Sequence, residues 1–166
     1  MAEETVWRGH SSQWQNIGRF AWAGLIAVGI VVVFFIASAF FPPGIHVFAT
    51  LILLLLVAPI IMAATAFLQT KTRSYELTTE RLKTTSGIFT KVTETLELYR
   101  VKDIETRQPF FYRMMGLETV QLNTSDASSP IVLIDAVPSS AQIADKTRNQ
   151  VEIIRTQKRV REIDIE

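Results

Sequence analysis

Long apolar runs occupy much of the first half of the chain, at residues 20–41 and 45–68. Neither run contains Asp, Glu, Lys or Arg, and each exceeds the about 20 residues that a helix needs to cross a bilayer. Because lipid offers no water to broken backbone hydrogen bonds, we expect two continuous helices, with Pro59 as the candidate kink. The Pro-Pro-Gly sequence at residues 42–44 cannot extend a helix and predicts a tight turn. The pattern therefore predicts a membrane hairpin.

From residue 69 onward, apolar positions alternate with polar ones, which predicts short β-strands. The Ser86-Gly87 pair is typical of a turn and indicates a hairpin. Residues 131–137 are apolar enough to predict a strand that is covered on both faces. The expected strands are residues 75–77, 82–86, 90–98, 99–108 (bent), 119–124 and 131–137, and the side chains expected to point inward include Tyr75, Leu77, Val92, Leu96, Leu98, Val101, Ile104, Val120 and Leu122.

Two helices are expected among these strands. Pro109 suits a first helical position and Gly116 a left-handed cap, so residues 109–115 should form one or two turns. A longer helix should begin near Ser139, which forms a capping-box pattern with Gln142. Its apolar stripe, spaced i, i+4, i+8 and i+11, consists of Ile143, Thr147, Val151 and Ile154.

The polar N-terminal segment, residues 1–19, has two interpretations. The favoured one is a juxtamembrane segment in which Trp7 and Trp14 rest at the membrane interface. The other is that residues 5–8 pack as an extra strand on the domain that follows the hairpin.

Orientation follows from the positions of the cations. The turn between the apolar runs carries no Lys or Arg, so the positive-inside rule places both ends of the chain in the cytoplasm. The flanking cations are Arg8, Arg19, Lys71, Arg73, Arg81 and Lys83. A signal-peptidase site is the alternative at Ala37-Ser38-Ala39, but the preceding apolar run is too long for a typical signal core, and cleavage would leave the second run in place.

Composition narrows the function. The 166 residues carry 17 Lys and Arg against 16 Asp and Glu, a net charge of +1, which argues against a nucleic-acid binder. There is no cysteine, which excludes disulfides and thiolate metal sites. His10 and His46 fall on opposite sides of the predicted membrane, so they cannot join in a triad or metal cluster. We expect no catalytic site, no metal and no cofactor.

Several motifs carry a resemblance to a known family. About seven short strands followed by one amphipathic helix is the order of a pleckstrin-homology-like (PH-like) barrel. The chain closely resembles the bacterial PH-like "membrane-flanked" domain proteins, from Trp7-Arg-Gly-His-Ser through the hairpin and into the domain. The motifs in the domain are Tyr75-Glu-Leu-Thr-Thr-Glu-Arg-Leu, Gly87-Ile-Phe, Glu97-Leu-Tyr-Arg-Val-Lys-Asp-Ile, Gln108-Pro-Phe-Phe-Tyr-Arg-Met-Met-Gly-Leu and Thr124-Ser-Asp.

The resemblance implies a PH-like barrel of two packed sheets with a C-terminal helix, an inner-membrane setting and no known activity; it implies no ligand. The expected organisation is a juxtamembrane segment (1–19), two transmembrane helices (20–68), a cytoplasmic PH-like domain (69–154) and a basic extension (155–166).

Three groups of residues are candidates for function. The first could face an anionic leaflet or could merely set topology: Lys71, Arg73, Arg81 and Lys83. The second could form an anion- or partner-binding edge, or could pair with Asp103 and cap nearby carbonyls: Arg100, Lys102, Arg107 and Arg113. The third could be an assembly segment that adds a short strand to a neighbouring subunit, or a frayed tail: Arg155, Lys158, Arg159, Arg161, Ile163 and Ile165.

The favoured hypothesis is an inner-membrane, non-enzymatic binding or assembly module that forms a homo-oligomer, with membrane lipids and another protein as further candidate partners. The competing hypothesis is a lipid-headgroup binder or sensor. The least favoured hypothesis is an enzyme or an oligomeric channel. The apolar runs carry no ionisable residue except His46, beside the turn, whereas transport pathways are normally marked by buried charge.

Overall fold

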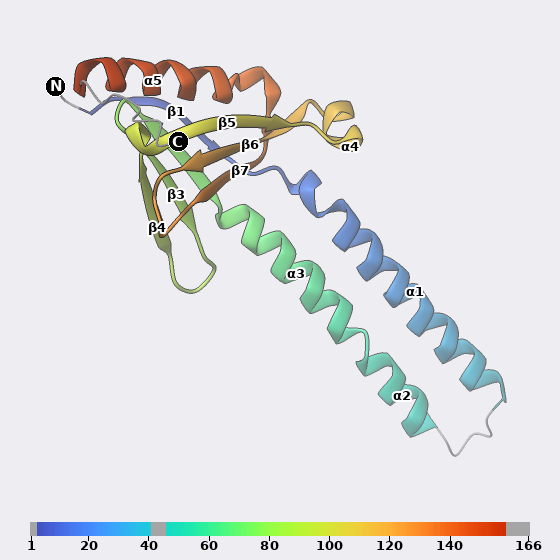
Figure 1. The fold of residues 1–166 in the computed structure, drawn as a ribbon. Helices are drawn as coiled ribbons and strands as arrows, with labels where there is room; N and C mark the ends of the chain where they lie inside the picture. The colour runs from blue at the N-terminus through green and yellow to red at the C-terminus, as the bar shows by residue number, and fades with distance from the viewer. Residues whose placement is uncertain (1–2, 41–45, 159–166) are drawn as a thin grey trace. The chain divides into compact units, whose positions relative to one another are not determined.

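The computed structural model describes residues 3–40 and 46–158. It divides into two compact units, a helical unit (residues 16–68) and a domain of strands and helices (residues 1–15 and 69–166). The domain is therefore discontinuous in sequence, because the helical unit is inserted after the first strand of the domain (Figure 1).

The helical unit consists of α1 (Ile17–Phe40), which follows the short helix η1 (Gln13–Asn16), then α2 (His46–Leu54) and α3 (Val57–Thr72). The helices α2 and α3 run back antiparallel to α1 (Figure 1). Asn16 Nδ2 donates a 3.0 Å hydrogen bond to Ala66 O and joins the first and last parts of the unit. Two helical segments are long and apolar enough to cross a membrane, residues 13–40 and 50–72. In the most apolar 18-residue stretch of each segment, only 6% and 11% are buried, respectively.

The second apolar run is not the continuous helix that was expected. It is interrupted at Leu55 and Leu56, between α2 and α3. Pro59 has no N–H to donate to Leu55 O, and Ala58 N binds that oxygen instead, at 3.2 Å. The preceding amides also make tighter i to i−3 bonds, because Leu55 N binds Ile52 O at 3.1 Å. Pro59 therefore interrupts the helix about one turn before its own position.

The part of the domain that the structure describes contains seven strands in two antiparallel sheets. The first sheet has the order β1-β2-β3-β4, with β1 (Thr5–His10), β2 (Ser74–Thr78), β3 (Arg81–Ser86) and β4 (Val92–Glu97). The second has the order β5-β6-β7, with β5 (Val101–Arg107), β6 (Leu117–Thr124) and β7 (Ile131–Pro138). The short helices η3 (Leu98–Arg100), α4 (Phe110–Met114) and η4 (Ser139–Ala141) connect strands, and α5 (Ile143–Lys158) ends the described chain. This is the expected PH-like arrangement, with two separate sheets in place of a closed barrel.

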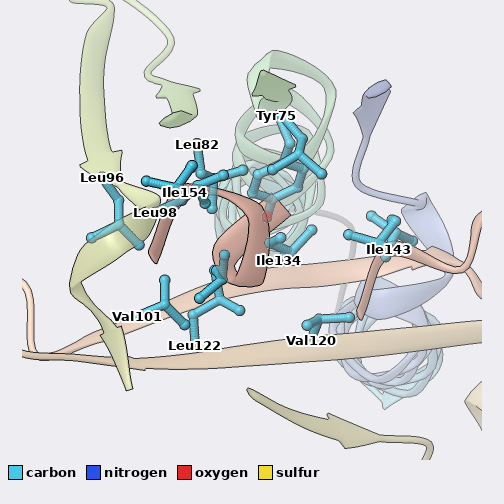
Figure 2. Close-up of a cluster of buried hydrophobic side chains, with 13 residues drawn as sticks. Tyr75, Leu82, Leu96, Leu98, Val101, Val120, Leu122, Ile134, Ile143 and Ile154 are labelled. Carbon is cyan, nitrogen blue, oxygen red and sulfur yellow. The ribbon is translucent and has the colours of Figure 1, made fainter. Parts of the chain in front are cut away.

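One hydrophobic core joins both sheets and α5 (Figure 2). The expected helix stripe is confirmed, because Ile143, Thr147, Val151 and Ile154 are all buried. Tyr75 also links the sheets through polar contacts, since its hydroxyl lies 3.2 Å from Ser11 Oγ and accepts a 3.0 Å hydrogen bond from Asp135 N. The core is built from β2, β3, β4, η3, β5, β6, β7 and α5, through Tyr75, Leu77, Leu82, Leu96, Leu98, Val101, Val120, Leu122, Ile134, Val137, Ile143, Val151 and Ile154.

The N-terminal segment is the first correction. Residues 5–10 form β1, which pairs with β2 from Thr5↔Thr78 to His10↔Ser74. The interpretation that placed Trp7 at the membrane interface is therefore wrong, because Trp7 packs against the hydrophobic core. The alternative, an extra strand on the domain, is the one that the structure contains.

Three local predictions also need correction. Strand β7 is not covered on both faces, because Ile131 and Leu133 are exposed while Ile134 is buried. Val92, expected inside, is half exposed near the β3–β4 loop. The capping box does not form: Ser139 lies in η4, and Gln142 adopts a left-handed conformation between η4 and α5, so that α5 begins only at Ile143.

The short helix α4 forms as expected, but Pro109 does not occupy its first helical position. Pro109 is the residue before Phe110, with a non-helical ψ of 157, and α4 covers Phe110–Met114. Gly116 then adopts φ +64, the left-handed conformation that glycine reaches without a Cβ clash.

Candidate functional site

Three of the four candidate lipid-facing cations are paired inside the domain. Arg73 Nη1 lies 3.0 Å from Asp135 Oδ2, and Arg81 Nε lies 3.0 Å from Glu97 Oε1. Lys83 Nζ lies 4.0 Å from Glu3 Oε1, a looser pair. Lys71, in the last turn of α3, is exposed. Much of this charge is therefore balanced before any ligand binds.

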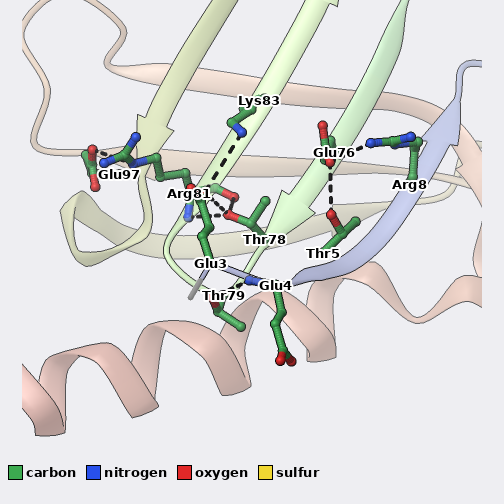
Figure 3. Close-up of polar contacts among 10 residues, drawn as sticks. All are labelled: Glu3, Glu4, Thr5, Arg8, Glu76, Thr78, Thr79, Arg81, Lys83 and Glu97. Atoms are coloured by element: carbon green, nitrogen blue, oxygen red, sulfur yellow. Dashed lines mark hydrogen bonds and ion pairs between the residues drawn. The ribbon is translucent and has the colours of Figure 1, made fainter. Parts of the chain in front are cut away.

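The outer face of the first sheet is polar and cross-linked (Figure 3). Glu76 Oε1 accepts hydrogen bonds from Arg8 Nη2 at 2.7 Å and from Thr5 Oγ1 at 3.0 Å. These bonds hold the pKa of the Glu76 carboxyl below its usual value, and the bond from Arg8 has the larger effect. Thr78 Oγ1 accepts from Arg81 N at 2.9 Å and donates to Glu3 Oε1 at 2.7 Å. The contacts fasten β1 and the residues before it to β2 and β3.

An open hollow of about 450 Å³ lies on this sheet, near the ends of the strands where His10 pairs with Ser74. The hydroxyls of Thr85 and Thr93 lie 3.1 Å apart at its wall. Cationic and hydroxyl groups in one hollow can bind an anionic group of small size, and Glu76 offsets part of the positive charge. The hollow is lined by Arg8, His10, Ser74, Tyr75, Glu76, Lys83, Thr85 and Thr93.

The second candidate set does not form one cluster. Arg100 directly precedes β5 and Arg107 is its last residue, so the strand separates them by roughly 20 Å. Arg100 Nη1 lies 2.9 Å from Asp126 Oδ2, and Arg107 binds both carboxylate oxygens of Glu105, at 2.9 and 3.1 Å. Lys102 and Arg113 are exposed.

Asp126 replaces the partner that was expected for this edge, Asp103, whose carboxylate accepts a hydrogen bond from Ile104 N at 2.8 Å. The pKa of the Asp126 carboxyl lies below its usual value, first because Ser128 donates hydrogen bonds to it and then because of the charge of Arg100. The arrangement is a structural tie between the β6–β7 loop and the start of β5.

The third candidate set begins inside the domain. Arg155 lies on α5, and its Nη2 donates a 2.7 Å hydrogen bond to Val101 O. Lys158 is the last residue of α5. Arg159, Arg161, Ile163 and Ile165 lie outside the described residues.

Two exposed apolar surfaces were not predicted. Phe89, in the β3–β4 loop, is 99% exposed. On α4, Phe110 and Phe111 are 62% and 66% exposed, with ring centroids 5.6 Å apart, and Met114 is also exposed. The signal was present in the sequence, since a five-residue helix with four aromatic or Met side chains cannot bury them all against one sheet.

Glu118, on β6, is a buried carboxyl whose pKa is shifted by its surroundings. It accepts a 3.1 Å hydrogen bond from Gln108 Nε2. Burial, helped by the negative charge of Asp145, raises the pKa of Glu118 above its usual value. Among residues 3–40 and 46–158 there is no group of three or more His, Cys, Asp or Glu side chains that could hold a metal ion.

The comparison with protein families fits this fold. Residues 20–159 match the family model described as "Bacterial PH domain". The chain belongs to the bacterial PH domain family. Proteins of this family are generally non-catalytic, and PH domains commonly bind lipids or proteins. The match includes the apolar helices and α5, while β1 lies before it.

No curated protein matches the chain. A solved structure described as "Vps36 N-terminal PH domain" is 20% identical, with a TM-score of 0.39; the alignment covers 54% of this chain and 68% of that one.

Proposed function

We propose that this bacterial PH domain protein is a membrane-anchored, non-enzymatic module for binding and assembly, homo-oligomeric, with both termini on the cytoplasmic side of the inner membrane. The observation that carries the proposal is the insertion of two apolar, membrane-length helices between β1 and β2, which are neighbouring strands of one sheet.

The insertion attaches the domain to the helices at two points. His10, the last residue of β1, pairs with Ser74, the first residue of β2. Residue 10 is followed by α1 at Ile17, and residue 74 is preceded by α3, which ends at Thr72. Two short connections from adjacent strands restrict the domain far more than one flexible linker would. Such an anchor would keep a binding surface at the bilayer.

The exposed apolar surface of the helices supports a lipid environment. A core helix of a water-soluble protein covers its apolar side chains with other protein atoms, whereas α1 contains one buried residue, Ala23. Large contiguous apolar surfaces on a soluble monomer are rare.

A topology experiment tests the anchor. A reporter fused after Glu166 should be active only if it works in the cytoplasm, and a reporter inserted beside Gly44 only if it works in the periplasm. Intact mass should retain residues 1–39, because signal cleavage after Ala39 would remove β1 from its sheet. A periplasm-active fusion after Glu166 would contradict the proposal.

For assembly, we assign a role to β7. It is an edge strand of the second sheet, and Ile131 and Leu133 are exposed on it. An exposed edge can accept a strand from another chain, with backbone hydrogen bonds supplying affinity. The C-terminal segment alternates Ile163 and Ile165 with Asp164 and Glu166, and we propose that it adds to β7 of a second copy.

Truncation tests this assembly. The cut belongs after Lys158, because Arg155 is bonded to Val101 O and an earlier cut would damage the docked α5. The truncated protein should fold and run as a monomer in mild detergent. Leu133→Lys should have the same effect, while Ile153→Lys, on the exposed side of α5, serves as the matched control. An unchanged mass for both the truncation and Leu133→Lys would refute this route to the oligomer.

Anionic-lipid headgroup binding is the second candidate function, and the hollow beside His10 favours it. The full chain, released from mixed-lipid nanodiscs into a mass spectrometer, should then retain one anionic lipid over another of equal charge. Lys83→Gln should abolish this preference, because Lys83 lines the hollow. Lys102→Gln, which removes the same charge from exposed β5, should leave it unchanged. Equal loss of the lipid preference in both variants would indicate that bulk charge alone attracts the lipid.

A further inference from the structure

The exposed apolar side chains of the domain differ in their distance from the two junctions with the helices. We define the junctions as residues 11–12, before α1, and residues 73–74, after α3. Phe89 and α4 lie near the junctions, as the strand pairing shows. Ile131, at the far end of β7, is five residues from Ala136, whose carbonyl accepts a 2.8 Å hydrogen bond from Ser12 N. That separation corresponds to roughly 17 Å.

The β3–β4 loop lies at the junction end of the first sheet. Ser74 pairs with Thr85, and the last pair before the loop is Ser86↔Val92. Strand β3 therefore returns to the level at which β2 begins, and the loop carries the chain farther in the same direction (Figure 1). Phe89 lies at the middle of this loop, beyond the last strand pair. Its side chain is 99% exposed.

Helix α4 is close to the same junctions through β7. Arg73 is paired with Asp135 at 3.0 Å, and Ser12 is bonded to Ala136. Two residues farther along β7, Pro138 pairs with Leu117. Gly116, directly before Leu117, ends the turn that follows α4, and its carbonyl accepts a 2.9 Å hydrogen bond from Ser139 N.

We propose that the β3–β4 tip and α4 both insert into the headgroup and acyl-chain boundary of the bilayer that the protein's own helices cross. This inference rests on the proposed membrane anchor. We choose the bilayer as the binding partner because both surfaces lie near the residues at which the chain enters the apolar helices. Ile131, which is also exposed, lies far from these residues. Phe and Met side chains enter the boundary favourably, and Lys91 beside the tip and Arg113 on α4 can reach lipid phosphates.

The chain has no cysteine, so single spin labels need no altered background. Phe89→Cys and Phe111→Cys, each labelled in the full chain in nanodiscs of zwitterionic and anionic phospholipid, should be relaxed by oxygen, which partitions into lipid, and protected from a water-soluble nickel reagent. Both native side chains are exposed, so folding should be unaffected. Ile153→Cys and Ser128→Cys, also exposed, should show the reverse. Val28→Cys, in α1, reports on the anchor itself.

The outcomes separate this inference from the proposed anchor. Oxygen access at positions 28, 89 and 111 would support both. Oxygen access at position 28 with nickel access at positions 89 and 111 would overturn the insertion and leave the anchor intact. Protection of position 111 from both reagents would show that protein covers α4, which also overturns the proposal. Nickel access at position 28 would overturn the anchor, and the inference with it.

Discussion

Helices α1 and α5 are both long, and they bury their apolar residues in different ways. In α5, the buried side chains lie on one stripe, and that stripe faces both sheets of the domain. In α1, apolar side chains surround the helix and only Ala23 is buried. The amphipathic helix finds its partner in its own domain, whereas a helix that is apolar on all sides needs a surrounding apolar medium. The difference is the one that the proposed membrane anchor predicts between a lipid-facing helix and a helix docked on its own domain.

The energetics of the two helices follow from this difference. A fully buried Val, Leu or Ile side chain contributes about 1.5–3 kcal/mol by leaving water. In α5 this stabilises the folded domain directly, through Ile143, Val151 and Ile154. In α1 the same gain requires apolar surroundings outside the described chain, which the proposed membrane anchor supplies as lipid. Substitutions in α5 should therefore change unfolding of the domain, and substitutions in α1 should change membrane insertion.

The largest expected effect is that of Val151→Asp. Val151 is buried on the α5 stripe, so the change places an unpaired carboxylate in the core. The free energy of unfolding should fall by about 3–5 kcal/mol. Denaturant unfolding of the full chain in detergent, followed through the near-UV signal of the domain, measures it. Ile153→Asp, two residues away and exposed, should be almost neutral; an equally neutral Val151→Asp would show that α5 is not docked.

The corresponding change in α1 is Val28→Asp. A carboxylate near the centre of a spanning helix costs about 2.5–3.5 kcal/mol of insertion free energy. We expect less protein in the carbonate-resistant membrane fraction, with Val28→Leu as the control that keeps the apolar surface. Unfolding of the domain should be unchanged where the variant does insert. Full membrane integration of Val28→Asp would remove the distinction between the two helices.

The α5 stripe could be predicted because its signal is local. Ile143, Thr147, Val151 and Ile154 repeat with the helix period, and all four are buried. The start of α5 could not, because Ser139–Ala141 form the separate short helix η4, which ends at Gln142 in the left-handed conformation, φ 49. A non-glycine residue with positive φ has no clear signal in the sequence, so the break before Ile143 appears only in the structure.

The same limit applies to strand pairing and to the site. Strand β1 pairs with residues more than 60 positions later, so its short polar sequence could not distinguish a strand from a juxtamembrane segment. The basic residues were grouped by density in sequence. Arg107 pairs with Glu105 on its own strand, but other partners come from distant strands and loops, as Asp135 does for Arg73 and Asp126 for Arg100. Ion pairs between segments that are distant in sequence have no sequence period, so this part of the charge balance appears only in the folded domain.

A smaller effect sharpens the account of the α5 stripe. Thr147 is fully buried, and its Oγ1 has no hydrogen-bond partner among the residues that the structure describes. A buried hydroxyl without a partner is unfavourable, and Val has nearly the same shape. Thr147→Val should therefore raise the free energy of unfolding by about 1 kcal/mol, measured by chemical denaturation. Thr156→Val, on the exposed side of α5, should not; destabilisation by Thr147→Val would mean that the hydroxyl is satisfied.

The smallest effect concerns Glu118, whose environment includes the first turn of α5. Burial is the main cause of its raised pKa, and Asp145 on α5 adds to it. Because the folded-state pKa lies above the unfolded value, Glu118 favours folding fully only below the unfolded pKa, and this contribution is lost as pH rises through the folded pKa. Above the folded-state pKa the ionised, buried carboxylate therefore costs stability.

Glu118→Gln should remove that cost, because the amide oxygen can still accept the hydrogen bond from Gln108. Its stability relative to the original protein should rise as pH increases from 4 to 7, with a gain at pH 7 below that of Thr147→Val. Asp145→Asn should produce part of the same change, since removing the charge lowers the pKa of Glu118, while Glu152→Gln, exposed on α5, should produce none. Denaturant unfolding at several pH values measures all three. If Asp145→Asn left the pH dependence untouched, the first turn of α5 would not act on Glu118, and the docking of the helix would be limited to its apolar stripe.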